Sequence, residues 1–368
     1  MTSVRFLIVG VFVLVSVSAL ILYNTGSKSV GSTSKHSTSS NVSGGSHPNA
    51  SHQPVTLGVY AGPANPSGVA EFGTLIGQKP QYAEEFLDDT SWQSIENPAW
   101  FISQWKDSGY SMVWGVPMLP SNPPTGTAPG DVSLAMGASG AYDQYFINLA
   151  KVFVAGGQGS SIIRLGWEFN VTGAWYPWVA TGQPANFVAY WRQIVTSMRS
   201  VPGADFKFDW NPANGDTTSP ALANYYPGDT FVDLVGLDVY DVAYTRYPGS
   251  AKEFSDLETE PYGLDWFASF AAKHGKVMTL PEWGLGWGTS NNGGVLTAFN
   301  KPLCGGDDAT FVDDMMGWIS THQVVAPIFW DYGQSVIGNG SNPKTQAALA
   351  AWDDHSQAPV GQVPASGV

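Results

Sequence analysis

The feature that most constrains the fold is a repeated alternation, after Val55, of short β-type runs with helical patterns. Eight runs are rich in β-branched and aromatic residues and end in acids, Asn or Trp. They cover residues 56–62, 81–89, 110–118, 161–170, 206–214, 232–240, 276–284 and 324–332. Strands that are almost continuously apolar and separated by helices are typical of parallel sheets buried on both faces. Eight of them favour a (β/α)8 TIM barrel, of the α/β class, over a doubly wound sheet.

Amphipathic patterns predict helices between several of these runs. Asn97 as a cap and Pro98 as the first helical residue predict a helix over residues 98–106. The large apolar residues of 187–198 recur at helical spacing. Similar patterns cover residues 142–153, 264–273 and 311–319. The Trp residues on such helix faces, which we expect in the core, are Trp105, Trp191 and Trp318.

The N-terminal segment is distinct from the barrel in composition. Arg5 precedes residues 6–23, an apolar run longer than most signal-peptide cores and close to a membrane span in length. Residues 1–25 are therefore either a signal peptide or an N-terminal membrane anchor, and both predict a secreted or extracellular protein. Residues 26–53 are rich in Ser and Gly and predict a flexible linker. The remaining predicted parts are a single folded domain, residues 54–358, and a flexible tail, residues 359–368.

Charge and cysteine content exclude several classes of partner. The chain has 30 acidic and 16 basic residues, and three of the basic ones but no acidic one lie in residues 1–54. The rest therefore carries 17 excess negative charges, from 30 acidic and 13 basic residues. Such a body repels nucleic acid, anionic lipid and polyanionic polysaccharide. Cys304 is the single cysteine, which excludes an intrachain disulfide and a thiolate zinc cluster. We expect a monomer without a cofactor.

Two carboxylates end predicted strands. Glu168 closes the fourth run and Glu282 the seventh, and active sites of barrels form where the carboxyl ends of the strands meet their loops. Glu168 has three interpretations: an ion pair with Arg164, which shares its face if the strand is extended, a metal ligand, or a catalytic acid. No histidine ends a predicted strand, which argues against a metal site. The sequence also has no GxSxG, GxGxxG or Walker motif.

The other predicted strand ends are acidic, aromatic or amide. They carry Tyr60, Asp88, Asp89, Trp114, Trp210, Asn211, Tyr240, Trp330 and Asp331. Paired carboxyls among aromatic rings suit glycoside hydrolysis, in which one acid protonates the leaving oxygen and the other stabilises or attacks the anomeric carbon. Sugar C–H faces stack on Trp and Tyr, and sugar hydroxyls bind Asn and Arg. The predicted ligand is a polysaccharide, and the predicted binding residues are Arg164, Asn170, Trp175, Trp178, Trp210, Asn211, Tyr240 and Trp330.

The surroundings of the two Glu residues predict different roles for them. Apolar and aromatic neighbours raise the pKa of a carboxyl such as Glu168, which keeps a general acid protonated near neutral pH. If Arg164 points at Glu282 instead of Glu168, it holds that second carboxyl in its ionised form. Asn170 and Tyr240 are then expected to orient hydroxyl or carboxylate groups around the pair.

The order of these motifs resembles glycoside hydrolase family 26, the β-mannanase and β-1,3-1,4-glucanase family. The resemblance rests on RLGWEFN with GAWYPW, then YYPGD with VDLVGLDVYD, then PEWG, and it spans residues 55–355. It implies a retaining (β/α)8 glycosidase with Glu168 as the acid/base and Glu282 as the nucleophile. It also implies that Tyr240 hydrogen-bonds the nucleophile and that Trp330 is a sugar platform. Family mannanases usually have His before the acid/base, whereas this chain has Trp167, which weakens the mannan assignment.

Two further hypotheses stay open from the sequence. One is a surface-tethered barrel that binds carbohydrate without cleaving it. The other is an inverting hydrolase that uses Asp88, Asp89 or Asp331. Carboxyl separation distinguishes the mechanisms, because retaining enzymes need roughly 5–5.5 Å and inverting enzymes roughly 6.5–9.5 Å.

Overall fold

The structure is a computed structural model of the 368-residue chain. It describes residues 55–122, 132–172, 174, 176–215, 221–241, 251–286 and 306–356. The predicted signal peptide or anchor, the linker and the C-terminal tail lie outside these ranges. Within the ranges, no helix has both the length and the apolar character that crossing a bilayer requires.

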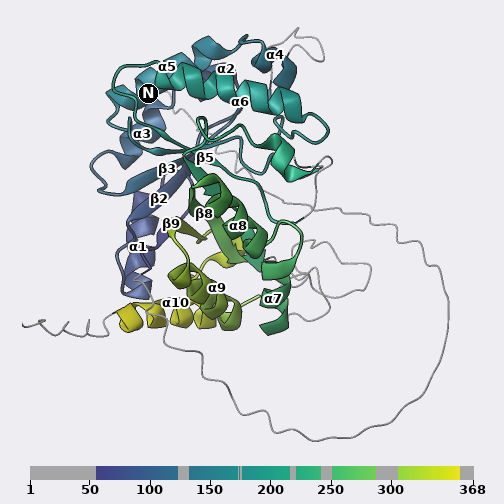
Figure 1. The fold of residues 1–368 in the computed structure, drawn as a ribbon. Helices are drawn as coiled ribbons and strands as arrows, with labels where there is room; N and C mark the ends of the chain where they lie inside the picture. The colour runs from purple at the N-terminus through teal and green to yellow at the C-terminus, as the bar shows by residue number, and fades with distance from the viewer. Residues whose placement is uncertain are drawn as a thin grey trace, which may run out of the picture.

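The strands form a closed parallel barrel (Figure 1). They are β1 (Gly58–Tyr60), β2 (Tyr82–Phe86), β3 (Ser111–Val116), β4 (Ile162–Leu165), β5 (Lys207–Trp210), β6 (Leu234–Gly236), β7 (Val239–Asp241), β8 (Val277–Leu285) and β9 (Val324–Trp330). Their order is β6-β5-β4-β3-β2-β1-β9-β8-β7, and β6 also pairs with β8. Strands β6 and β7 contact successive parts of β8 and so act together as one strand of the barrel. The prediction of an eight-stranded TIM barrel in a single domain is confirmed. Each predicted run overlaps its strand, and β7 and β8 end one residue beyond their runs.

Helices cover the outside of the barrel (Figure 1). They are α1 (Pro66–Ile76), α2 (Trp92–Glu96), α3 (Ala99–Trp105), α4 (Leu134–Ala138), α5 (Asp143–Ala155), α6 (Pro184–Arg199), α7 (Ala251–Thr259), α8 (Leu264–His274), α9 (Ala309–Thr321) and α10 (Pro343–Ser356), with short 3-10 turns η1 (Leu222–Tyr225) and η2 (Gly333–Ser335). The predicted helices are therefore present. One cap was wrong: Pro98 precedes the first residue of α3, and Asn97 instead ends α2.

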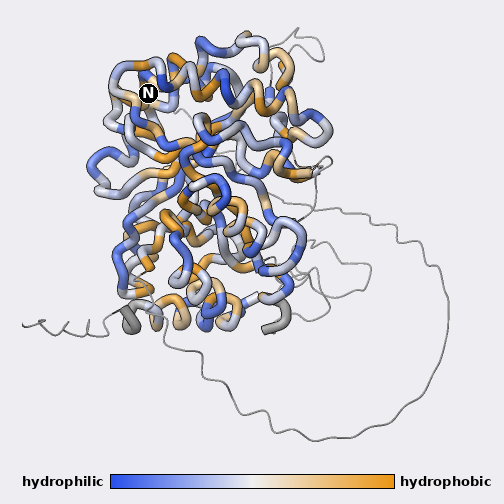
Figure 2. Tube along the Cα trace, viewed as in Figure 1, coloured by the Kyte–Doolittle hydropathy of each residue, from blue (hydrophilic) through white to orange (hydrophobic). Residues whose placement is uncertain are grey.

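The core lies between the barrel and its helices. Figure 2 shows apolar stretches along the strands and on the helices that cover them. Trp105, Trp191 and Trp318 are buried there, as their helical spacing predicted. The apolar core thus lies between the strands and the helices, and the polar residues of the candidate site lie inside the barrel.

Candidate active site

Glu168 follows β4 in a tight turn. The predicted run over residues 161–170 was too long as a strand, because β4 ends at Leu165. Gly166 has a φ of 54°, and a Cβ there would lie 2.4 Å from the Met118 sulfur, so only glycine fits. Glu168 itself has a φ of 50°, which few non-glycine residues adopt, and its N–H donates to the Asn211 carbonyl at 2.9 Å. The turn thus places the Glu168 carboxyl at the mouth of the barrel.

The environment of Glu168 suits a proton donor. Its side chain is buried, and the Tyr176 hydroxyl lies 3.4 Å from Oε2. Burial and the negative charge of Glu282 raise the pKa of Glu168 to about 7, although Arg164 and Tyr176 oppose the rise. The carboxyl is therefore protonated at mildly acidic pH, which a general acid requires.

Glu282 lies in β8 where the pairing with β9 becomes irregular. The register shifts between Thr279 and Leu280 and again between Leu280 and Trp283. The second stretch includes Pro281, and proline lacks the N–H that a regular ladder needs. The carboxylate accepts two hydrogen bonds, from Arg164 Nη1 to Oε1 at 2.6 Å and from the Tyr240 hydroxyl to Oε2 at 2.5 Å. The guanidinium and the phenol, which donate to different oxygens, fix the orientation of the carboxylate.

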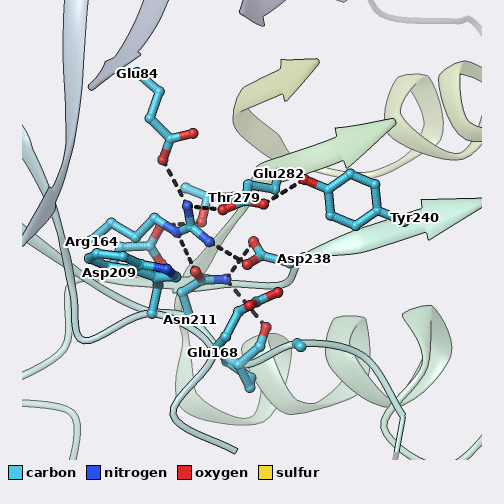
Figure 3. A network of polar contacts seen from close by, with 12 residues as sticks. Glu84, Arg164, Glu168, Asp209, Asn211, Asp238, Tyr240, Thr279 and Glu282 are labelled. Carbon is cyan, nitrogen blue, oxygen red and sulfur yellow. Dashed lines mark hydrogen bonds and ion pairs between the residues drawn. The ribbon is translucent and has the colours of Figure 1, made fainter. Parts of the chain in front are cut away.

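Arg164 lies at the centre of the polar network, wholly buried (Figure 3). Its Nη1 also contacts Glu84 at 3.0 Å, its Nη2 donates to Asp238, and its Nε donates to Asn211. Its ion pairs are with carboxylates other than Glu168. The interpretation of Glu168 as the ion-pair partner of Arg164 was therefore wrong, because the chain leaves the strand conformation before residue 168.

Carboxyls outnumber cations inside the barrel. The guanidinium of Arg164 faces five of them, namely Glu84, Glu168, Asp209, Asp238 and Glu282. Burial raises the pKa of Asp209 to about 7 and the pKa values of Glu84 and Asp238 well above their usual range, with Arg164 lowering each of them. Since one positive charge cannot balance five negative ones in a buried site, some of these carboxyls carry protons at neutral pH.

Three carboxyls approach one another closely enough to be compared with a metal site. Oxygens of Glu168, Asp238 and Glu282 all lie within 4.8 Å of one another. A divalent cation bound there would meet the guanidinium of Arg164, which already donates to Asp238 and Glu282. The donor set therefore suits an internal ion-pair network better than a cation site.

The two predicted Asn residues have positioning contacts. Asn211 accepts from Arg164 and donates to Asp238 Oδ1 at 3.0 Å. Asn170 binds the backbone of Ala213 twice, with its Nδ2 donating to the carbonyl at 2.8 Å and its Oδ1 accepting from the N–H at 2.8 Å. Both side chains are buried. These contacts tie the loop after β4 to the loop after β5, which holds the turn of Glu168 in place.

The predicted aromatic residues divide into two groups. Trp330 lies at the end of β9, stacks on Tyr60 with ring centroids 4.3 Å apart, and has Tyr240 at 6.4 Å. Its ring is 8% exposed and borders the Tyr240 that contacts Glu282. Trp175 lies outside the described residues. A direct contact with substrate was a wrong expectation for Trp178 and Trp210, and a place at the mouth was wrong for Trp114, because all three side chains are fully buried. Trp178 packs on Trp167 and Tyr176 in the loop after β4, whereas Trp210 and Trp114 pack on rings of α8 and α5.

The aspartates considered for an inverting mechanism make local loop contacts. Asp88 accepts from the Thr90 N–H at 2.7 Å, Asp89 accepts from the Ser121 hydroxyl at 3.2 Å, and Asp331 accepts from the Ile337 N–H at 2.8 Å. None of these contacts joins the Arg164 network. They act as loop caps in this structure.

Sequence reasoning missed several members of the network. Asp238 lies between β6 and β7, and Glu84 and Asp209 lie inside β2 and β5. Thr279 donates to Asp209 at 2.6 Å, and Gly236 leaves room for that pair, since a Cβ there would lie 2.8 Å from Asp209. The sequence feature that could have identified them is an acidic residue inside an apolar strand run. Burying a carboxylate costs free energy unless it faces a cation.

Comparison with known proteins agrees with this geometry. Residues 162–263 match the model of glycosyl hydrolase family 26, and the match includes Arg164, Glu168, Asp238 and Tyr240. This segment belongs to family 26. The resemblance found in the sequence is therefore confirmed. A "Mannan endo-1,4-beta-mannosidase" of Bifidobacterium adolescentis is 32% identical over 117 residues, which are 30% of this chain and 11% of that protein.

Solved structures of mannanases share the fold. A Cellulomonas fimi endo-beta-1,4-mannanase double mutant aligns with a TM-score of 0.55 and 20% identity, over 82% of this chain and 68% of that one. A family 26 β-mannanase from Bacteroides ovatus aligns with a TM-score of 0.51 and 16% identity, over 83% of this chain and 89% of that one. At these identities the likeness establishes the (β/α)8 barrel, while the chemistry has to be argued from the site.

Proposed function

We propose that this chain is a retaining glycosidase that cleaves a β-linked neutral polysaccharide of the β-mannan or β-glucan type. The observation that carries the proposal is the pair of carboxyls at the barrel mouth. An oxygen of Glu168 lies within 4.8 Å of an oxygen of Glu282, and the surroundings differ: burial favours the protonated form of Glu168, whereas Glu282 accepts hydrogen bonds from Arg164 and Tyr240. That separation suits direct attack better than the roughly 6.5–9.5 Å that an intervening water requires.

In the first step, the ionised Glu282 attacks the anomeric carbon while Glu168 gives its proton to the departing glycosidic oxygen. The glycosidic C–O bond breaks as the bond between the sugar and the Glu282 oxygen forms. Arg164 and Tyr240 hold Glu282 in position through the two hydrogen bonds it accepts. In the second step, the now ionised Glu168 takes a proton from water, the water oxygen attacks the anomeric carbon, and Glu282 leaves as a carboxylate.

The substrate class is supported by charge and by the relatives. The excess of acidic residues disfavours anionic polymers, so the polysaccharide is neutral. The names of the Bifidobacterium and Cellulomonas relatives describe endo-acting mannanases, which supports endo cleavage of β-mannan by this chain. Trp330, stacked on Tyr60 beside Tyr240, offers the aromatic surface against which a sugar ring would pack. Such polymers lie outside cells, and the apolar run of residues 6–23 supports export.

The proposal is tested by product stereochemistry on a panel of β-mannan, mixed-linkage β-glucan, β-1,3-xylan and cellulose. We expect release of reducing sugar from at least one polymer, and proton NMR should show the β-anomer as the first product. A first product with the α-configuration would instead indicate inversion. Binding without release on every polymer would favour a non-catalytic carbohydrate-binding barrel.

The isosteric variant Glu282→Gln is the matched control for the same panel. The amide oxygen can still accept from Arg164, and the amide NH2 can donate to the Tyr240 hydroxyl oxygen. The amide cannot act as a nucleophile, so the protein should fold and bind sugar while releasing none. Sugar release by this variant at the wild-type rate would contradict the assignment of Glu282.

A further inference from the structure

Two adjacent glutamates in β2 point to opposite sides of the barrel wall. Successive side chains of a strand alternate between faces. Glu85 faces the helix layer, where it accepts hydrogen bonds from Trp105 Nε1 at 2.8 Å, from the Ala64 N–H at 2.6 Å and from the Phe86 N–H at 3.1 Å. Glu84 faces the barrel interior and belongs to the Arg164 network (Figure 3). The two residues therefore offer a matched comparison within one strand.

The contacts of Glu84 differ from those of an ionised carboxylate. Its Oε1 accepts from Arg164 Nη1 at 3.0 Å, whereas the same nitrogen approaches Glu282 Oε1 at 2.6 Å. Its Oε2 is buried and has no hydrogen-bond partner among the described residues. Ionised oxygens make the shorter bonds to guanidinium, and burying a charged oxygen without a donor costs far more than burying a neutral hydroxyl.

Two neighbouring carboxyls also disfavour the ionisation of Glu84. Glu282 of β8 and Asp209 of β5 raise its pKa, whereas Arg164 of β4 lowers it. Tyr60 of β1 adds a neutral phenol on the remaining side, with burial raising its pKa well above the usual range. Only Arg164 in this set is a cation, and it already pairs with Glu282 and Asp238.

We propose that Glu84 is a positioning residue that works as a neutral acid, holding Arg164 against Glu282 without competing for its charge. The inference rests on the proposed role of Glu282 as the nucleophile. Because the Oε1 of Glu84 is the acceptor, its proton resides on Oε2. Burial raises the pKa of Glu84 well above its usual range, more than Arg164 lowers it, which agrees with this assignment.

A neutral Glu84 has a functional consequence for the nucleophile. An ionised Glu84 would draw Nη1 toward itself and add a negative charge beside Glu282, which opposes the ionised state that attack requires. A neutral carbonyl oxygen accepts the spare hydrogen bond of Nη1 and fixes the plane of the guanidinium. The full charge of Arg164 then remains available to Glu282 and Asp238.

The kinetic test compares Glu84→Gln, Glu84→Leu and Glu85→Gln with the wild type. Glu84→Gln keeps a neutral acceptor, so kcat and both limbs of the pH–rate profile should stay within about twofold and within about 0.3 pH unit. Glu84→Leu removes the acceptor and should lower kcat by about tenfold or more with little change in KM, because Arg164 is no longer held. Glu85→Gln turns one oxygen into a donor that faces N–H groups, so it should lower the melting temperature and leave kcat and the pH profile in place.

An infrared comparison tests the protonation state without any substrate. The difference spectrum of wild type minus Glu84→Gln should show the carbonyl band of a protonated carboxyl from acidic to mildly alkaline pH. A carboxylate band instead, or a Glu84→Gln variant with a displaced pH profile, would overturn the proposal. So would a Glu84→Leu variant that folds and retains wild-type kcat. If the wild type releases no sugar, the proposed function fails, while the infrared spectra still decide whether Glu84 carries a proton.

Discussion

Replacing Tyr176 by Phe isolates one of the interactions that set the proton affinity of Glu168. The ring of Tyr176 stacks on Trp178 with centroids 4.9 Å apart and planes 11° apart, and Phe preserves that packing. Only the hydroxyl, 3.4 Å from Glu168 Oε2, is lost. This hydroxyl donates to the ionised carboxylate and therefore lowers the pKa of Glu168, while burial and Glu282 raise it to about 7.

The size of the effect follows from the length of that contact. O–H···O hydrogen bonds are usually 2.5–3.0 Å long, so a contact at 3.4 Å is weak. A contribution of about 0.5–1 kcal/mol corresponds to roughly 0.4–0.7 pH unit, at 1.36 kcal/mol per unit. Because a general acid acts only while protonated, kcat/KM falls as pH rises through the pKa of the acid. Tyr176→Phe should therefore move the basic limb of the profile upward by this amount.

The assay is kcat/KM against pH on the best polysaccharide of the panel, with Tyr190→Phe as the control. The Tyr190 hydroxyl donates to the Met118 carbonyl at 2.5 Å within the core, so its loss should lower the melting temperature without moving the limb. A basic limb that stays in place in Tyr176→Phe, or moves downward, would refute the assignment of that limb to Glu168.

Three further substitutions have defined outcomes. Tyr240→Phe removes the 2.5 Å hydrogen bond to Glu282. Because a hydrogen bond to a charged group contributes about 1.5–3 kcal/mol, kcat/KM at the optimal pH should fall about 10- to 150-fold. An unchanged kcat/KM would exclude a role for this hydroxyl. Trp330→Ala should raise KM, and because the ring packs on Tyr60 it should also lower the free energy of unfolding by about 3–5 kcal/mol. Trp330→Phe should also raise KM but keep most of the free energy of unfolding, which urea titrations measure. Burial raises the pKa of Asp209 to about 7, so the stability of the folded protein falls as pH rises from the unfolded value of 3.8 through 7. Asp209→Asn should therefore raise the melting temperature more at pH 8 than at pH 5; equal effects at both pH values would contradict this.

The barrel was predictable from sequence because its signal repeats. Each of the eight β-type runs overlaps a strand, since a parallel strand buried on both faces must be apolar along its length. Glu168 and Glu282 stood out for the same reason, as acids at the ends of such runs. The inference that Arg164 points at Glu282 was also available, because an Arg within a buried strand needs a carboxylate partner.

Side-chain direction was harder to predict than strand position. Trp178 and Trp210 were expected to contact substrate, but a change of one residue in the phase of a strand or turn moves a side chain to the other face. Both rings are fully buried, Trp178 against Trp167 and Tyr176 and Trp210 against Phe270 of α8. Glu84 and Asp238 were missed because their importance depends on which strands lie beside β4 and β8 in space. Asn170 was predicted to bind sugar or to orient groups of the site. In the structure its amide instead hydrogen-bonds the backbone of Ala213.

The measurement that tests the central claim most directly is azide rescue of the two glutamate variants. In Glu282→Ala, turnover of all substrates should stop, and azide should restore a reaction whose product has the anomeric configuration opposite to that of the substrate, because the anion attacks from the vacated face. In Glu168→Ala, dinitrophenyl glycosides should still form the glycosyl-enzyme, and azide should give a product of retained configuration, while polysaccharide stays almost uncut. Equal loss on good and poor leaving groups, with no effect of azide on either variant, would contradict the assignment of Glu168 as acid/base and Glu282 as nucleophile.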